Sequence, residues 1–161
     1  MSAFNKKTKM DIIIPPHHKI AVPVKNYKEI RKDAELMVKL VDGRFKGHWK
    51  SALAISHAQV SENPKTFFAL NIKYALYFKL PRIVINPKII RGWDEKIVKE
   101  GCMDFQKEKA VKIKRFNKVE VEYLKPTFFG LKPMRGEFED IMAWMFQHEL
   151  LHFEGKNIYD R

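Results

Sequence analysis

Two stretches of the chain repeat apolar residues at the spacing of an α-helix. The first predicts a helix from Tyr27 to about Val41, because its apolar residues fall three or four positions apart. Asn26 stands where it can cap this helix, and Asp42-Gly43 is typical of a helix end. The apolar stripe comprises Ile30, Ala34, Met37 and Val41.

The second stretch lies near the C-terminus and carries two histidines on its apolar face. We expect a helix that begins near Gly136, where acidic residues in the first turn suit the positive end of the helix dipole. Its stripe comprises Phe138, Ile141, Met145, His148 and His152. One face of this helix therefore combines apolar side chains with both imidazoles.

The middle of the chain predicts β-strands. It contains short β-branched or aromatic runs. In the last two, apolar and polar residues alternate, as they do in strands with one solvent-exposed face. The runs are Thr66–Leu70, Arg82–Pro87, Lys109–Lys114 and Lys118–Leu124. Strand ends or turns are predicted at Pro81, Pro87, Pro126 and Pro133. We therefore expect an α+β fold, with mixed, mainly antiparallel sheets packed around the C-terminal helix and a second helix near the N-terminus.

The composition describes one folded domain. With 161 residues, 45% hydrophobic and 31% charged, the chain can bury a core. We expect a monomer with a single domain over residues 1–161, of which residues 1–10 form a flexible basic leader. No apolar run approaches the roughly 18–20 residues of a membrane helix, and no signal-peptide pattern is present. The single cysteine, Cys102, fits a reducing compartment, so we predict a cytoplasmic protein with no membrane partner.

The net charge of +12 favours a polyanionic neighbour such as nucleic acid, the ribosome or an anionic membrane face. The lysines are spread along the chain, however, and no nucleic-acid motif is recognised. A lysine-rich proteome would produce the same charge, and charge alone gives only non-specific attraction. No specific DNA partner is expected.

The motif that indicates chemistry is His-Glu-x-x-His, from His148 to His152. Residues four apart share one face of a helix, so both imidazoles can reach one divalent ion. Glu149 lies near such a metal but offset from it, where its carboxylate can take a proton from metal-bound water. The alternative is a chance pair of histidines that fills surface or core, and the apolar stripe around them argues against it.

Two histidines leave a catalytic metal one ligand short of the usual three protein ligands. Nine residues follow His152, and they offer Glu154 and Asp160 as donors. The upstream candidate is Cys102, which follows a glycine, Gly101, that lets the backbone approach a site closely. A lone cysteine is also commonly a small buried hydrophobe, so the residues alone leave the third ligand open.

Three stretches, in order, resemble the three motifs of the peptide deformylase family. Gln147 to Phe153 is similar to the family's Gln-His-Glu-x-Asp-His-Leu, and Glu100 to Asp104 is similar to Glu-Gly-Cys-Leu-Ser. Ala52 to Gln59 resembles Gly-x-Gly-Leu-Ala-Ala-x-Gln more distantly. Softer similarities at Ile85-Asn86-Pro87 and at Ile158 to Arg161 extend the resemblance over nearly the whole chain from about Asp11.

The resemblance implies a metal-dependent hydrolase that removes the N-formyl group from the initiator methionine of nascent polypeptides. The implied metal ligands are Cys102, His148 and His152. Glu149 would be the general base and then the acid. Gln59, through its side-chain amide, and Met103, through its backbone N–H, would stabilise the oxyanion. The family implies Fe(II) as the usual metal, with nickel, cobalt or zinc as substitutes.

The same resemblance implies a substrate pocket, which departs from the family at several positions. The implied pocket residues are Leu53, Ala54, Val98, Glu100, Gly101, Ile141, Trp144 and Met145. Ala52 and Ala54 replace glycines and would add methyl groups where the substrate backbone runs. Leu151 replaces an aspartate, a change of the kind that tunes affinity or rate by roughly 10–100-fold. Trp144 is bulkier than the family norm and would narrow or reshape the pocket.

The resemblance also bears on partners. The chain ends at Arg161, as the family's short and phage forms end, without the C-terminal helix that many bacterial members use at the ribosome. Its expected partners are N-formylmethionyl nascent peptides, with the basic surface as a candidate for ribosome docking. Arg115 resembles the family's strand arginine and would pair with Glu100; an exposed arginine on an edge strand is the alternative.

Two other functions stay open at this point. One is a metal-dependent amidase for a different N-acyl substrate, which the two alanines and Trp144 motivate. The other is a catalytically weak homologue whose basic surface binds the ribosome or RNA.

Overall fold

The computed structural model describes residues 19–43, 52–101 and 110–160. The predicted leader at residues 1–10 and the candidates Cys102 and Met103 lie outside them. The elements are η1 (Tyr27–Glu29), α1 (Arg31–Val41), β1 (Ala54–Ser56), η3 (His57–Gln59), β2 (Phe67–Leu70), α2 (Ile72–Tyr77), β3 (Ile83–Glu100), β4 (Val111–Thr127), β5 (Gly130–Glu139) and α3 (Ile141–Phe153). Within the described ranges, no helix is long and apolar enough to cross a membrane.

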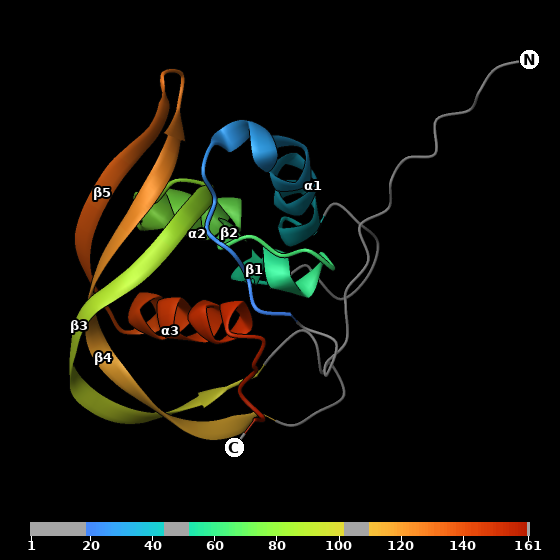
Figure 1. The fold of residues 1–161 in the computed structure, drawn as a ribbon. Helices are drawn as coiled ribbons and strands as arrows, with labels where there is room; N and C mark the ends of the chain where they lie inside the picture. The colour runs from blue at the N-terminus through green and yellow to red at the C-terminus, as the bar shows by residue number, and fades with distance from the viewer. Residues whose placement is uncertain (1–18, 44–51, 102–109, 161) are drawn as a thin grey trace, which may run out of the picture.

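The strands form one antiparallel sheet in the order β1-β2-β3-β4-β5 (Figure 1). Each strand pairs with its neighbour in sequence, so the sheet is a meander without crossovers. The long strands β3 and β4 pair from Ile85↔Leu124 to Glu100↔Val111 and curve around α3. The predicted α+β class with mainly antiparallel strands is confirmed.

The observed strands are longer than the sequence predicted. The run Lys118–Leu124 and the part of the preceding run from Val111 to Lys114 belong to one strand, β4, because the residues between them also pair with β3 or continue the ladder. Lys109 lies outside the described residues. Pro87 lies inside β3 rather than at its end, at a register shift between Ile85 and Lys88 that accommodates a residue without an N–H. Pro133 lies within β5, an edge strand, where one side of the backbone faces no partner strand.

The N-terminal helix forms where the sequence predicted it, in two parts. The single turn η1 precedes α1, which buries Ala34, Met37 and Val41. Asn26 occupies the residue before η1, but its side chain caps no backbone N–H; its amide donates to Glu29 Oε1 at 3.1 Å instead. Gly43 follows α1 with φ 70°, a left-handed conformation that glycine adopts without strain.

Two hydrophobic clusters lie on opposite faces of β2. Phe68 and Leu70 belong to the cluster that packs on α3, and Phe67 and Ala69 belong to the cluster that packs on α1. Successive side chains of a strand point to opposite faces, so α1 and α3 sandwich β2 between them. This burial on both faces explains why the run reads as continuously apolar rather than alternating.

The C-terminal helix begins at Ile141, five residues after the predicted start at Gly136. Gly136 and Phe138 lie in β5 and pair with Val121 and Val119. The prediction that Phe138 belongs to the helical stripe is wrong, because an apolar residue three positions before Ile141 satisfies a helical pattern and a strand pattern equally. The first turn of α3 contains no acidic residue, so the predicted interaction with the helix dipole is wrong.

A buried histidine connects the helix α1 to the turn η3. The His57 ring accepts a hydrogen bond from the Lys65 backbone N–H at Nδ1, and its Nε2–H donates to Asp33 Oδ2, both at 2.9 Å. The ring also lies against Phe67, with centroids 4.5 Å apart. Burial lowers the pKa of His57, and the hydrogen bond to Asp33 opposes that shift only in part.

We predict that His57 makes folding stability depend on pH. Its folded-state pKa is depressed, so below its ordinary value of 6.5 the unfolded chain binds a proton that the folded chain does not. Stability should then fall as pH decreases, by at most about 1.4 kcal/mol per pH unit from this residue. His57→Gln keeps a donor and an acceptor but cannot titrate, so its urea unfolding free energy should decline less steeply between neutral and mildly acidic pH. Parallel profiles for the two proteins would contradict this assignment.

Candidate functional site

Helix α3 carries the histidine motif and is fixed at both ends. At its start, Asn117 on β4 donates through Nδ2 to Asp140 Oδ1 at 3.0 Å, and the Asp140 N–H donates to the Asn117 carbonyl at 2.9 Å. At its end, Gly155 has φ 73°, and the N–H groups of Gly155 and Lys156 donate to the carbonyls of His152 and Leu151. That pattern is a Schellman motif, which stops the helix directly after the second histidine.

The two histidines of α3 face one another. His148 Nε2 and His152 Nε2 lie 3.2 Å apart, and the His152 side chain is fully buried. Two nitrogen ligands about 2.0–2.1 Å from one tetrahedral metal are separated by about 3.3–3.4 Å. The observed separation therefore fits a pair of ligands for one divalent ion. Glu149, which follows the first histidine, is also buried.

A carboxylate orients the first histidine. Glu100, the last residue of β3, accepts a hydrogen bond from His148 Nδ1 at 3.0 Å. A carboxylate only accepts, so the proton resides on Nδ1 and the lone pair of Nε2 points toward His152. Metal-binding histidines are commonly held in this way by a carboxylate on the other ring nitrogen.

The same carboxylate is held by an arginine from the neighbouring strand. Arg115 on β4 donates through Nε and Nη2 to the two oxygens of Glu100, at 2.8 and 3.0 Å. Both side chains are nearly buried, at 7% and 10% exposed. The predicted pairing of Arg115 with Glu100 is confirmed, and the alternative of an exposed arginine is wrong. Both oxygens of Glu100 are engaged by Arg115 and His148, and its expected contact with substrate stays a prediction.

Electrostatics at this cluster favour an ionised Glu100 and stabilise positive charge next to it. Burial alone would raise the pKa of Glu100, but hydrogen bonds from His148 and Arg115 hold that pKa below its ordinary value. Burial likewise opposes the charge on His148, while the hydrogen bond to Glu100 and the nearby charge of Glu149 raise its pKa. The imidazole thus lies in a negative field, which also favours a bound cation.

The sequence indicates no role for Gln147 beyond its place in the motif. Its side chain joins α3 to β4: Nε2 donates to the Phe116 carbonyl at 2.8 Å, and Oε1 accepts from the Phe116 N–H at 2.9 Å. Because Gln147 directly precedes His148, this two-way bond fixes the rotation of the helix relative to the sheet. The pattern available in the sequence, an amide beside a histidine, does not identify a backbone partner on a distant strand.

The predicted oxyanion residue Gln59 lies in η3, which contacts α3. It is buried, and its Oε1 accepts the Ser56 backbone N–H at 2.9 Å. That bond fixes which way the amide points. The other predicted oxyanion donor, Met103, lies outside the described residues.

The predicted substrate residues fall into two groups. Ala54 and Met145 belong to the α3 core cluster, with Leu53 and Trp144 packed against it. The Trp144 indole N–H donates to Asn117 Oδ1 at 3.2 Å, so its position is fixed by β4. Outside that cluster, Val98 is buried, Gly101 is exposed, and Ile141 is 41% exposed at the start of α3. The structure therefore brings together four of the predicted residues, Leu53, Ala54, Trp144 and Met145, and Ile141 does not join their cluster.

The predicted third ligand, Cys102, directly follows Glu100 and Gly101 but lies outside the described residues. Among the residues that the structure describes, no three histidine, cysteine, aspartate or glutamate side chains could hold one metal ion. The downstream candidates are engaged elsewhere: Glu154 pairs with Lys156 at 3.5 Å, and Asp160 accepts the Asn157 N–H at 2.8 Å. The described geometry therefore offers no downstream replacement for the cysteine.

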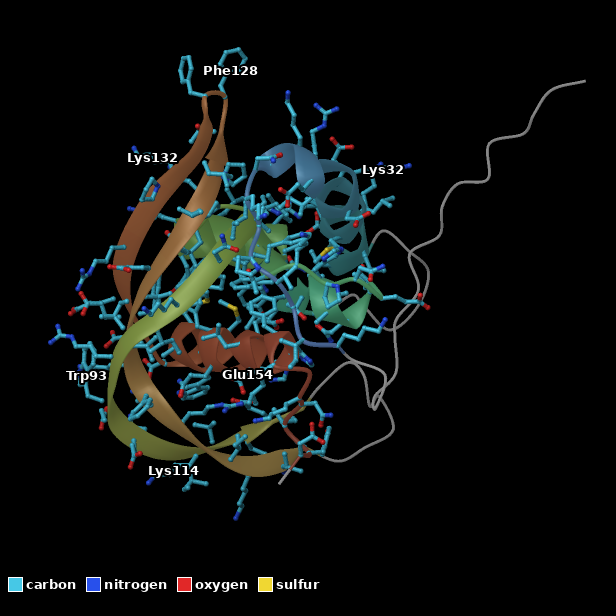
Figure 2. All side chains as sticks on the ribbon, viewed as in Figure 1. Lys32, Trp93, Lys114, Phe128, Lys132 and Glu154 are labelled. Atoms are coloured by element: carbon cyan, nitrogen blue, oxygen red, sulfur yellow. The ribbon has the colours of Figure 1, made fainter. Side chains whose placement is uncertain are left out.

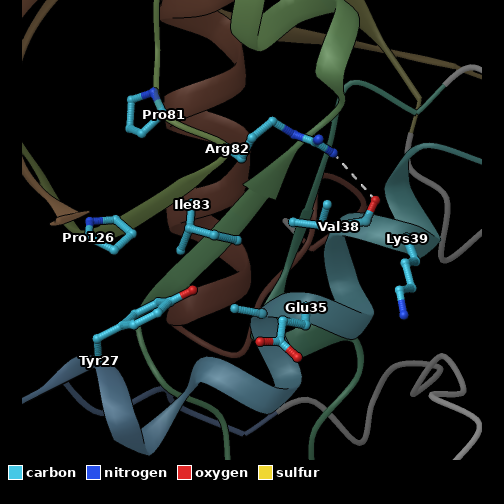
Figure 3. Close-up of a pocket in the computed structure, with 9 residues that line it drawn as sticks. Tyr27, Glu35, Val38, Lys39, Pro81, Arg82, Ile83 and Pro126 are labelled. Atoms are coloured by element: carbon cyan, nitrogen blue, oxygen red, sulfur yellow. Dashed lines mark hydrogen bonds between the residues drawn. The ribbon is translucent and has the colours of Figure 1, made fainter. Parts of the chain in front are cut away.

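A separate groove lies between α1 and the start of β3, away from the histidines (Figure 3). Its cavity volume is about 530 Å³. It is lined by Tyr27, Ala34, Glu35, Val38, Lys39, Pro81, Arg82, Ile83 and Pro126. None of the predicted site residues takes part, so this groove is not the candidate site.

The chain thus combines an antiparallel α+β fold with a His-Glu-x-x-His helix on which a carboxylate orients the first histidine. The polypeptide deformylase family model matches residues 10–161. The chain belongs to the polypeptide deformylase family.

Individual relatives agree with that placement. Peptide deformylase 3 of Shewanella oneidensis is 25% identical over 147 residues, which cover 91% of this chain and 85% of that protein. Peptide deformylase 2 of Vibrio cholerae is 34% identical over 80 residues, so this match spans only 50% of the chain and 45% of the relative. The crystal structure of peptide deformylase from Thermotoga maritima superposes with a TM-score of 0.74 at 26% identity, covering 95% of each chain.

We predict that Glu100→Gln weakens metal binding by about 10–100-fold, because the neutral amide orients His148 less firmly. The measurement is Zn(II) affinity by competition with a chromophoric chelator. Glu120→Gln is the matched control, since Glu120 also accepts from two arginines, Arg91 and Arg135, but on the solvent side of the sheet. Equal Zn(II) affinity for Glu100→Gln and Glu120→Gln would show that Glu100 does not position the histidine.

Proposed function

We propose that this protein is a metal-dependent peptide deformylase that removes the formyl group from the N-terminal methionine of nascent chains. The 3.2 Å approach of His148 Nε2 to His152 Nε2 carries the proposal, together with family membership. In the reaction, water adds to the formyl carbon, the C–N bond breaks, formate leaves and the amine nitrogen gains a proton.

The metal would be held by His148, His152 and Cys102. When bound, it supplies a Lewis acid that lowers the pKa of water toward neutrality. The soft thiolate suits Fe(II) or Zn(II), with Ni(II) and Co(II) as further candidates, and we favour Fe(II) in the cell from the family. Support comes from the fit of the two histidine nitrogens and from the negative field around His148.

Other residues of the protein would transfer the proton and stabilise the oxyanion. Glu149 is buried one residue after the first ligand, where its carboxylate accepts a proton from water and returns it to the leaving amine. The Gln59 side chain and the Met103 backbone N–H would donate to the oxygen of the formyl group as charge develops on it. The hydrogen bond from Ser56 supports this role, because it orients the Gln59 amide before substrate arrives.

The methionine side chain of the substrate would lie against apolar residues of α3 and of the segment before β1, chiefly Met145, Trp144 and Leu53. These residues pack on the α3 core cluster, which supports a preformed apolar wall. We further propose that the protein acts in the cytoplasm on N-formylmethionyl peptides.

We predict that Glu149→Gln lowers the rate of formate release from formyl-Met-Ala-Ser by about 10²–10⁴-fold, because the amide cannot take up the proton. The measurement is formate release by anaerobically purified protein, with metal content determined on the same samples. Glu154→Gln is the matched control: it lies on the same helix end, but its side chain is exposed and pairs with Lys156. The control should retain both metal and activity.

The outcomes separate the parts of the proposal. Full activity of Glu149→Gln with one metal per chain would remove Glu149 as the base. Metal-loaded wild type that releases no formate would refute the deformylase assignment. Loss of metal in Glu154→Gln would instead indicate that Glu154 is a metal ligand, against the geometry described above.

We also predict a strong preference for formyl over acetyl peptides. The amidase alternative relied on Trp144 and on methyl groups of Ala52 and Ala54 facing the substrate. Both alanines are at most 7% exposed, one in each core cluster, so their methyl groups pack mainly among core side chains. Initial rates on formyl- and acetyl-Met-Ala-Ser test this expectation, and equal or faster turnover of the acetyl peptide would favour the amidase.

A further inference from the structure

The hairpin between β4 and β5 ends in two adjacent phenylalanines that face solvent. Phe128 and Phe129 are 97% and 95% exposed, and their rings meet edge to face with centroids 5.3 Å apart (Figure 2). They are the two turn residues between Thr127 and Gly130, where short hairpins favour asparagine, aspartate or glycine. Large apolar side chains at both positions break the local rule, which marks a surface selected for contact.

The turn that presents these rings is ordered by its own contacts. Thr127 pairs with Gly130, and the Thr127 hydroxyl donates to the Gly130 carbonyl at 2.7 Å. Gly130 has φ 120°, which a residue with a side chain rarely adopts. The next register pair, Pro126 and Leu131, is also apolar. The hairpin end is therefore a defined apolar wedge, which we call the aromatic tip, made of Phe128 and Phe129. Leu131 below it packs against the core cluster on α1.

Two lysines form a collar below the aromatic tip. Lys125 and Lys132 are direct cross-strand partners, and neither forms an ion pair with another described residue. Like charges directly opposite each other on a sheet are unfavourable unless an anion lies near them. The segment from Tyr123 to Met134 contains these two lysines and no acidic residue. The collar therefore suits an anionic surface.

The spacing of tip and collar matches a lipid interface. The lysine pair lies two register pairs below Thr127 and Gly130, or about 7 Å at the rise of an antiparallel strand. Peripheral apolar groups enter a bilayer by about 5–10 Å, which leaves lysines at this distance level with the phosphates.

Single-stranded nucleic acid fits the aromatic tip less well. Successive bases stack in parallel on aromatic platforms and are tracked by a basic groove. The two rings lie at 88° to each other on a convex tip, so they cannot both stack on consecutive bases. A protruding wedge with a cationic collar fits insertion into an apolar layer better.

We propose that the aromatic tip and its lysine collar form a peripheral docking site for an anionic lipid membrane. The contact is independent of the proposed catalytic function. The expectation of no membrane partner relied on the lack of a spanning segment, and a peripheral contact needs none. Phe128 and Phe129 enter the acyl boundary, and Lys125 and Lys132 bind lipid phosphates.

The test is co-sedimentation of the full chain with vesicles of phosphatidylcholine, or of equal parts phosphatidylcholine and phosphatidylglycerol. We expect binding to the anionic vesicles only. Phe128→Ser with Phe129→Ser should weaken partitioning at least about tenfold, because two rings lose apolar burial. Lys125→Ala with Lys132→Ala should weaken it by about 30-fold, from the attraction of two lysines to an anionic surface.

The chain offers matched controls for both changes. Lys99 and Lys112 are also exposed cross-strand partners, but at the other end of the β3–β4 ladder, so Lys99→Ala with Lys112→Ala should bind vesicles like wild type. Ile97→Ser removes another exposed apolar side chain, 67% exposed on β3, and should also leave binding unchanged. Circular dichroism melting checks that every variant folds.

Three results would overturn the proposal. The first is wild type that does not bind anionic vesicles. The second is the phenylalanine double variant binding vesicles as wild type does. The third is vesicle binding that survives in both the phenylalanine and the lysine double variants while another interaction is lost. Loss of affinity for a single-stranded oligonucleotide would assign the tip to RNA, and loss of a dimer in sedimentation would assign it to a second copy of the chain.

Discussion

The site depends on one buried carboxylate that joins three elements. Glu100 ends β3, accepts two hydrogen bonds from Arg115 on β4, and accepts another from His148 on α3. A carboxylate removed from water is costly unless its oxygens are satisfied. Here both oxygens are, so the charge is retained and its field acts on the histidine. If either partner moved, Glu100 would be left underpaired, and this cost keeps the three elements in one arrangement.

That arrangement places demands on the helix as well. Nε2 of His148 can meet Nε2 of His152 only if the α3 axis and rotation are both fixed. Gln147 fixes the rotation through its two-way bond to Phe116, and Asn117 fixes the start of the helix through Asp140. Phe116 and Asn117 both lie on β4, as does Arg115. One strand therefore positions the arginine, the helix start and the helix rotation, which explains why β4 is long and lies beside α3.

The sequence predicted the fold class, the N-terminal helix and the location of the histidines, because each depends on a local pattern. It misplaced the start of α3, since Phe138 satisfies a period of two as well as a period of 3.6 and only its pairing with Val119 decides. The resemblance predicted the pairing of Glu100 with Arg115, but nothing local in the sequence shows that His148 also reaches this carboxylate. The role of Gln147 was missed for the same reason: its partner is the backbone of a distant strand.

The β3–β4 ladder also connects the two features that the chain presents to other molecules. At one end of the ladder Glu100 pairs with Val111 beside the histidine helix, and at the other Leu124 leads into the hairpin that carries Phe128 and Phe129 (Figure 1). Strand β4 runs unbroken from Val111 to Thr127, so the orientation of the hairpin is coupled to that of the site. If the aromatic tip rests on an anionic bilayer, the histidine site is held at the opposite end of the ladder, away from the lipid. Substrate would then reach the site from the aqueous side, and docking need not compete with catalysis.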